Sequence, residues 1–124
     1  MLSGKIHRAR ITMADVDYEG SITIPPELLE MSGIRVNEQV HVWNVTSGNR
    51  LETYAISGEA GSTDFCMNGA AAHLMTPGDL VIISSFADVP EELLAEHFPK
   101  IVFLDGKNRL KEIRAEVSGK KVSN

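Results

Sequence analysis

The feature of this sequence that most constrains its fold is a succession of short strand-like runs separated by turns. The runs are rich in β-branched and aromatic residues and cover residues 6–12, 18–24, 40–45, 50–57, 63–68, 80–86, 100–105 and 109–113. Turn sequences such as "TSGN", "GEAGS" and "TPGD" lie between them. Residues 40–45 and 50–57 resemble a hairpin, and the apolar run "LVIISSF" is typical of a fully buried strand. This pattern predicts a mainly β protein that forms a compact barrel.

Two short helices are predicted between these strands. The segment "PPELLEMSG" at residues 25–33 has proline in its first turn, and Gly33 is suited to end the helix. The segment "DVPEELLAEHF" at residues 88–98 starts with Asp88, which is followed three residues later by Glu91, as in a capping box. Pro99 follows its end.

Length and composition fit one globular domain spanning residues 1–124. The chain has 124 residues, of which 43% are hydrophobic and 23% charged, so it can form one real core. The formal net charge is −5 with no clustered basic face, so no nucleic-acid partner is expected. The N-terminus "MLSGKIHRAR" carries charges where a signal peptide needs an apolar stretch, and no apolar run could span a bilayer. We therefore expect a cytoplasmic protein with no membrane partner.

Several common chemistries lack their motifs. The sequence has neither a Walker loop nor G-x-G-x-x-G, and it has no nucleophile-elbow motif. Its four histidines are scattered, and no pair of them has metal-ligand spacing near the single Cys66, so no metal is expected. One cysteine also excludes an intrachain disulfide framework. An enzyme of this kind would need its electrophile from another source.

The stretch "YEGSITI" places Gly20 and Ser21 inside a run whose other residues predict a strand. Glycine in a strand often marks a bulge or a close backbone approach, which is the ordinary interpretation. The alternative is that the Gly20–Ser21 bond is itself the site of chemistry. These residues alone leave both interpretations open.

Three other stretches carry candidate functional residues. They are "GKIHR" with Lys5 and His7, "WNVTSGNRLETYAI" with Trp43, Arg50, Thr53 and Tyr54, and "NGAAAH" with Asn68, Gly69, Ala70 and Ala71. Each residue taken singly also has an ordinary structural role, as a solvated charge, a core aromatic or a strand residue.

Taken together, these motifs resemble the pyruvoyl-dependent aspartate 1-decarboxylases of bacterial pantothenate synthesis. The resemblance runs from Leu2 to about Phe86 through "GKIHRARIT", "DYEGS", "WNVTSGNRLETYAI", "NGAAAH" and "GDLVIISSF", in that order. It implies a small double-ψ β-barrel that assembles as a homotetramer, with active sites at subunit boundaries.

The resemblance also implies a cofactor made from the chain itself. The Ser21 hydroxyl would attack the Gly20 carbonyl, giving residues 1–20 and residues 21–124 with a pyruvoyl group in place of Ser21. No pyridoxal phosphate and no metal would be needed. Glycine at position 20 would leave the carbonyl open and tolerate unusual backbone geometry. By resemblance, Thr53 donates a hydrogen bond to the oxygen of Gly20. The sequence leaves open whether cleavage needs a helper protein.

The implied reaction converts L-aspartate to β-alanine and CO2. Tyr54 would be the proton donor, and Arg50 offers a planar fork suited to a substrate carboxylate. Lys5 and His7 would add charge complementarity. The implied substrate-site set is completed by Thr53, Asn68, Gly69, Ala70 and Ala71, with Trp43, His7, Tyr18 and Ile82 as pocket wall.

Two alternatives belong to other functional classes. One is a non-enzymatic small barrel, either a binding module or a partner subunit, in which Gly20 is only a bulge. The other is an ordinary hydrolase that uses Ser21 as nucleophile in an intact chain. Only the self-processing decarboxylase requires chain cleavage, which a denaturing gel would reveal.

Overall fold

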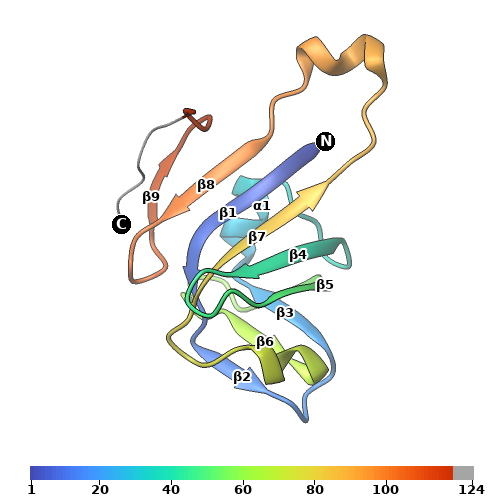
Figure 1. The fold of residues 1–124 in the computed structure, drawn as a ribbon. Coiled ribbons are helices and arrows are strands. Elements are labelled where there is room, and N and C mark those ends of the chain that lie inside the picture. The colour runs from blue at the N-terminus through green and yellow to red at the C-terminus, as the bar shows by residue number, and fades with distance from the viewer. Residues whose placement is uncertain (119–124) are drawn as a thin grey trace.

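The computed structural model describes residues 1–118, and most of its regular structure is strand (Figure 1). The strands are β1 (Leu2–Arg10), β2 (Met13–Asp15), β3 (Ser21–Ile24), β4 (Gln39–Asn44), β5 (Arg50–Ser57), β6 (Cys66–Asn68), β7 (Leu80–Phe86), β8 (Lys100–Leu104) and β9 (Leu110–Ile113). The helices are α1 (Pro26–Ser32) and the 3-10 helices η1 (Gly69–Leu74) and η2 (Glu91–Glu96). The prediction of a mainly β fold is confirmed.

The two predicted helices have different outcomes. Helix α1 has proline in its first turn and ends at Gly33, which has φ +73 and donates its N–H to the Glu30 carbonyl, as expected. The second helix, η2, is a 3-10 helix, and it starts after Pro90 without a side-chain cap. The capping box expected at Asp88 is therefore wrong. All residues of η2 are exposed, so it has no apolar face that packing could extend into an α-helix.

The strands form one mixed sheet in the order β2-β6-β3-β5-β4-β7-β1-β8-β9. Strand β1 pairs antiparallel with β7 and parallel with β8, and β3 pairs antiparallel with β6 and parallel with β5. In Figure 1, β2 and β6 lie at one end of the molecule, while η2 projects beyond the sheet at the other. The predicted hairpin of residues 40–45 and 50–57 is present as the antiparallel pair β4–β5.

One apolar core lies against the inner face of the central strands. Ile6, Ile83 and Val42 occupy one register across β1, β7 and β4, and each is fully buried. Ile22, Phe65 and Met67 extend this core toward β3 and β6. Because side chains alternate along a strand, the neighbours of these core residues face outward.

The predicted strand over residues 18–24 begins only at Ser21. The preceding residues form a turn, in which the Asp15 side chain accepts the N–H of Asp17 at 3.0 Å and the Asp15 carbonyl accepts that of Tyr18 at 3.4 Å. An aspartate of this kind stabilises a turn at the expense of the strand. Residues 13–15 form the separate strand β2, which the sequence pattern did not predict.

Candidate active site

The Gly20–Ser21 bond lies where the turn enters β3. Ser21 is only 2% exposed and has φ +107, a conformation that non-glycine residues rarely adopt. Within residues 1–118, its buried Oγ has no hydrogen-bond partner. Backbone strain and an unpaired buried hydroxyl both raise the free energy of the folded chain at this point.

The unusual backbone conformation belongs to Ser21, contrary to the expectation for Gly20. Gly20 is not among the residues with positive φ, and a Cβ added to it would meet no atom within 4 Å. Its φ angle and the space around its Cα therefore do not require glycine in this chain.

Gly69 packs directly against the bond. A Cβ at Gly69 would lie 2.9 Å from the Gly20 Cα and 3.4 Å from both the Gly20 nitrogen and the Tyr18 carbonyl oxygen. Gly69 has φ +70 and begins η1. This position thus needs glycine for both space and conformation, and the start of η1 packs against the Gly20 backbone.

Asn68 lies directly opposite Ser21 in the pairing of β3 with β6 and is 2% exposed. Its Nδ2 donates to Thr23 Oγ1 at 3.1 Å, and its Oδ1 accepts a hydrogen bond from Cys66 Sγ at 2.9 Å. These contacts hold the amide beside the bond. Neither Thr23 nor Cys66 was a predicted site residue, although each lies two residues along its strand from a residue that was.

Thr53 and Tyr54 point to opposite faces of β5. Thr53 is partly buried and pairs with the core residue Val40, whereas Tyr54 is 42% exposed. Strand β5 runs parallel to β3, and Ala55 of β5 is paired with Ile22 of β3. The residues just before this pair are Tyr54 and Ser21. Tyr54 is thus brought to the strand position beside Ser21. Within residues 1–118, no hydrogen bond joins Thr53 to the Gly20 oxygen.

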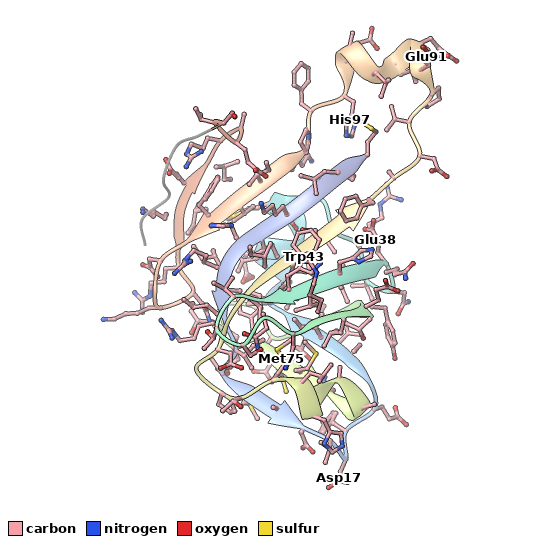
Figure 2. All side chains as sticks on the ribbon, in the orientation of Figure 1. Asp17, Glu38, Trp43, Met75, Glu91 and His97 are labelled. Carbon is pink, nitrogen blue, oxygen red and sulfur yellow. The ribbon has the colours of Figure 1, made fainter. Side chains whose placement is uncertain are left out.

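The predicted carboxylate-binding and pocket residues form a row on the outer face of the sheet. His7, Ile82, Trp43 and Arg50 are paired in succession across β1, β7, β4 and β5. The Arg50 guanidinium carbon lies 4.8 Å from the centre of the Trp43 ring, which supports a cation–π contact. Figure 2 shows Trp43 on β4 in the middle of this sheet.

A cavity of about 490 Å³ opens beside Arg50 and Trp43. Its lining is completed by His41, Leu51, Glu52 and Phe86. The His41 ring packs edge-on against Phe86, and its Nδ1 lies 3.7 Å from Glu52. Arg50 and Trp43 therefore combine a cation with an aromatic wall, which suits a small anionic ligand.

Lys5 and His7 extend the same outer face along β1. The Lys5 ammonium lies 3.0 Å from Glu116, a contact that the sequence did not predict. Burial, together with the positive charges of Lys5 and Arg8, lowers the pKa of His7 to about 4. His7 is therefore neutral at pH 7 and does not supply the positive charge expected of it. Its ring packs 5.3 Å from that of Phe103.

The predicted residues thus form two groups within one chain. The first surrounds the Gly20–Ser21 bond and consists of Asn68, Gly69 and, from β5, Tyr54. The second holds Lys5, His7, Ile82, Trp43 and Arg50. Lys5 and His7 on β1 are four strand-to-strand steps from β3, or roughly 19 Å along the sheet at the usual strand spacing, whereas Arg50 lies on β5, the neighbour of β3 that also carries Tyr54. Of the remaining residues, Ala70 and Ala71 lie on η1, and the 66% exposed Tyr18 borders a second cavity, next to Thr23 and Cys66.

The described residues contain no helix long and apolar enough to cross a membrane. Among the same residues, no group of three His, Cys, Asp or Glu side chains is placed to hold a metal ion.

Fold and site together define a small mainly β protein whose most unusual feature is a buried serine with a strained backbone φ angle. The family model described as aspartate decarboxylase matches residues 1–111. The aspartate 1-decarboxylase of Legionella pneumophila (strain Paris) is 64% identical over 98% of this chain and 91% of that protein. The aspartate 1-decarboxylase of Rhodopirellula baltica is 56% identical over 96% of this chain and 76% of that protein.

The chain belongs to the aspartate decarboxylase family. This membership confirms the resemblance seen in the sequence, and it confirms that the chain is an enzyme rather than a binding module. Among solved structures, the rationally designed mkDPBB_sym_86 protein is similar, with a TM-score of 0.49 and 13% identity over 65% of this chain and 95% of that protein. The mainly β content with short helices agrees with the fold class that the sequence predicted.

Proposed function

We propose that this protein cuts itself at Gly20–Ser21 and then decarboxylates L-aspartate to β-alanine and CO2. The observation that carries the proposal is Ser21, whose buried, unpaired hydroxyl and φ of +107 lie at the bond where the family motif "YEGS" falls. By the same proposal the chain is one domain that matures into residues 1–20 and 21–124.

The cleavage chemistry needs only atoms of the chain and one water. The Ser21 Oγ attacks the Gly20 carbonyl carbon, the C–N bond breaks, and the amide becomes an ester with a free amine on Ser21. Loss of the Gly20 carboxylate from the ester leaves a double bond in residue 21. Hydrolysis of this dehydroalanine releases ammonia and leaves a pyruvoyl group at the start of residues 21–124.

The surroundings of Ser21 fit this reaction. Its Oγ forms no hydrogen bond within residues 1–118 that would have to be broken before attack. Cleavage would release the strain stored at φ +107. Gly69 packs against the Gly20 backbone so closely that a Cβ at position 69 would lie 2.9 Å from the Gly20 Cα. The oxygen that gains charge at Gly20 needs a donor, and Thr53 is the residue we propose for it.

Burial also separates this proposal from an ordinary hydrolase. A serine that attacks an external substrate must be reached by that substrate, but Ser21 is 2% exposed. The carbonyl next to it in the chain is the one electrophile that needs no access. Self-cleavage therefore fits the buried hydroxyl better than hydrolysis of a foreign bond.

In turnover the pyruvoyl group supplies an electrophilic carbonyl that binds the substrate amine and accepts the electrons released with CO2. The chain's residues then have separate tasks. Tyr54 lies at the strand position beside residue 21 and gives a proton from its phenol group to the substrate carbon. Arg50, stacked on Trp43, binds a substrate carboxylate, and Asn68 donates toward residue 21.

Separation of the two residue groups supports active sites at subunit boundaries. Lys5 on β1 and Trp43 on β4 lie on the outer face of the sheet, four and two strand-to-strand steps from the strand of Ser21 in the same chain. A neighbouring copy could bring its own outer face to the cleaved end of the first chain. We therefore propose a homotetramer with shared sites, located in the cytoplasm and supplying β-alanine for pantothenate synthesis.

Ser21→Ala tests the proposal directly. Removing one hydroxyl that makes no hydrogen bond in residues 1–118 should cost little stability. The variant should fold, remain a single chain on a denaturing gel, and release no CO2 from L-aspartate. Decarboxylation by the uncut variant would disprove the assignment.

A further inference from the structure

We propose that Cys66 and Thr23 are positioning residues for Asn68, and that the Cys66 thiol sets which end of the Asn68 amide faces residue 21. This inference rests on the proposed function, because it assigns a role within the same site. It adds two residues to the functional set.

The four side chains form two neighbouring pairs across β3 and β6. Ser21 lies opposite Asn68, and Thr23 lies opposite Cys66. Residues two apart on a strand share a face, so all four lie on one side of the pair of strands. Asn68 is 2% exposed, and its buried amide is hydrogen-bonded to Thr23 and Cys66.

The thiol is the contact that decides the direction of the amide. The two ends of an asparagine amide are similar in size but opposite in polarity, since Oδ1 accepts and Nδ2 donates. The Thr23 hydroxyl can donate or accept, so it can pair with either end. The Cys66 S–H donates to Oδ1 at 2.9 Å and so directs Nδ2 to Thr23, 3.1 Å away.

The environment of Cys66 keeps its proton in place. Burial of the thiol, followed by the negative charges of Asp15 and Asp64, raises the pKa of Cys66 above its usual value. The thiol therefore stays protonated at neutral pH and can donate. A thiolate would instead favour the Nδ2 end of the amide and turn Asn68 around.

The direction of the amide matters because Asn68 lies directly opposite Ser21. An amide NH2 has two hydrogens, of which Thr23 accepts one. The other can stabilise an oxygen that gains negative charge at residue 21 during turnover. If the amide were reversed, its oxygen would be nearer that charge and would oppose it.

The test compares Cys66→Ala, which removes the donor, with Cys66→Ser, which keeps a donor of similar size. The extent of cleavage is measured by mass spectrometry, and kcat and KM are expressed per cleaved chain. We expect Cys66→Ala to lower kcat by about 3- to 10-fold, the range for one neutral hydrogen bond. KM should change by less than about twofold, and Cys66→Ser should recover part of the loss, because its hydroxyl can still donate to Oδ1 although it can also accept.

A double-mutant cycle shows whether Cys66 acts through Asn68. In an Asn68→Ala background, Cys66→Ala should have no further effect on kcat, because the amide that it orients is absent. Thr23→Val should resemble Cys66→Ala, while Thr23→Ser should stay near the native kcat. Melting curves of each variant separate a loss of folding from a loss of orientation.

Three results would overturn the inference: equal impairment of Cys66→Ser and Cys66→Ala, an undiminished effect of Cys66→Ala in the Asn68→Ala background, or a native kcat in Cys66→Ala. These outcomes concern variants of a cleaved and active parent. A parent chain that neither cleaves nor releases CO2 from L-aspartate would instead disprove the proposed function.

Discussion

Replacing Gly69 with alanine tests whether close packing against Gly20 holds the cleavage site in a reactive geometry. The new Cβ would lie 2.9 Å from the Gly20 Cα and 3.4 Å from the Gly20 nitrogen and the Tyr18 carbonyl oxygen. These are backbone atoms, so they can give way only if the segment that carries the Gly20–Ser21 bond moves. We expect slower cleavage in a chain that still folds.

Gly61→Ala is the matched control. Gly61 has φ +80 against +70 for Gly69, but a Cβ there meets no atom within 4 Å. Both variants bear the cost of a left-handed alanine, about 1–2 kcal/mol. Gly69→Ala adds overpacking, so its free energy of unfolding should be lower than that of Gly61→Ala by about 1–3 kcal/mol. Misplacement of reacting groups by about 1 Å can cost about 100-fold, so we expect cleavage to slow by roughly 10- to 100-fold.

The assay follows the mass of freshly purified chains over time and compares the rates at which intact chain disappears. Denaturant unfolding of each uncut variant measures the stability difference. Cleavage of folded Gly69→Ala at the native rate would refute the packing argument. Equal slowing in Gly61→Ala would show that the left-handed alanine alone, and not contact with Gly20, is responsible.

Three further predictions follow from the site. Arg50→Ala should cleave at least partly but lose most of its kcat/KM for L-aspartate. Arg35→Ala, an exposed control of the same charge, should keep native cleavage and native kcat/KM. Unchanged kinetics in Arg50→Ala would mean that Arg50 is only a solvated charge. Thr53→Val should slow cleavage by about 10²–10³-fold, while Tyr54→Phe should cleave normally and stall in turnover. Borohydride should therefore trap aspartate on Tyr54→Phe and not on Thr53→Val. If instead Tyr54→Phe blocks cleavage and Thr53→Val cleaves and turns over normally, the two roles are exchanged. The folded chain binds fewer protons at His7 than the unfolded chain between pH 6.5 and about 4, so the free energy of unfolding should fall as pH drops through this window. His7→Gln should reduce this fall by about 1 kcal/mol after allowance for solvent screening. The same pH profile in His7→Gln and the native chain would contradict the prediction.

Local pattern predicted much of the fold because alternation and turn residues act within a few positions. The strands at residues 50–57 and 80–86 match β5 and β7, and Gly33 ends α1. The strand expected from residue 18 failed because the Asp15 side chain stabilises a turn that hydrophobicity does not reveal. The helix at residues 88–98 failed as an α-helix because it has no face to bury.

Motif order pointed to the Gly20–Ser21 bond as the proposed cleavage site, but only the structure shows the backbone geometry at that bond. No sequence pattern states that Ser21 has φ +107 or that its hydroxyl is unpaired, because both depend on the pairing of β3 with β6. The neutral state of His7 likewise depends on burial and on charged neighbours. Glu116, which pairs with Lys5 across more than a hundred residues, had no local signal at all.

The central claim is that Ser21 becomes a pyruvoyl group, and intact-mass spectrometry of the purified active protein tests it most directly. We expect two pieces, residues 1–20 and residues 21–124. The larger piece should be lighter by one ammonia than the same piece beginning with serine. An active sample that contains only the intact 124-residue chain, or a larger piece that retains its serine, would contradict the account.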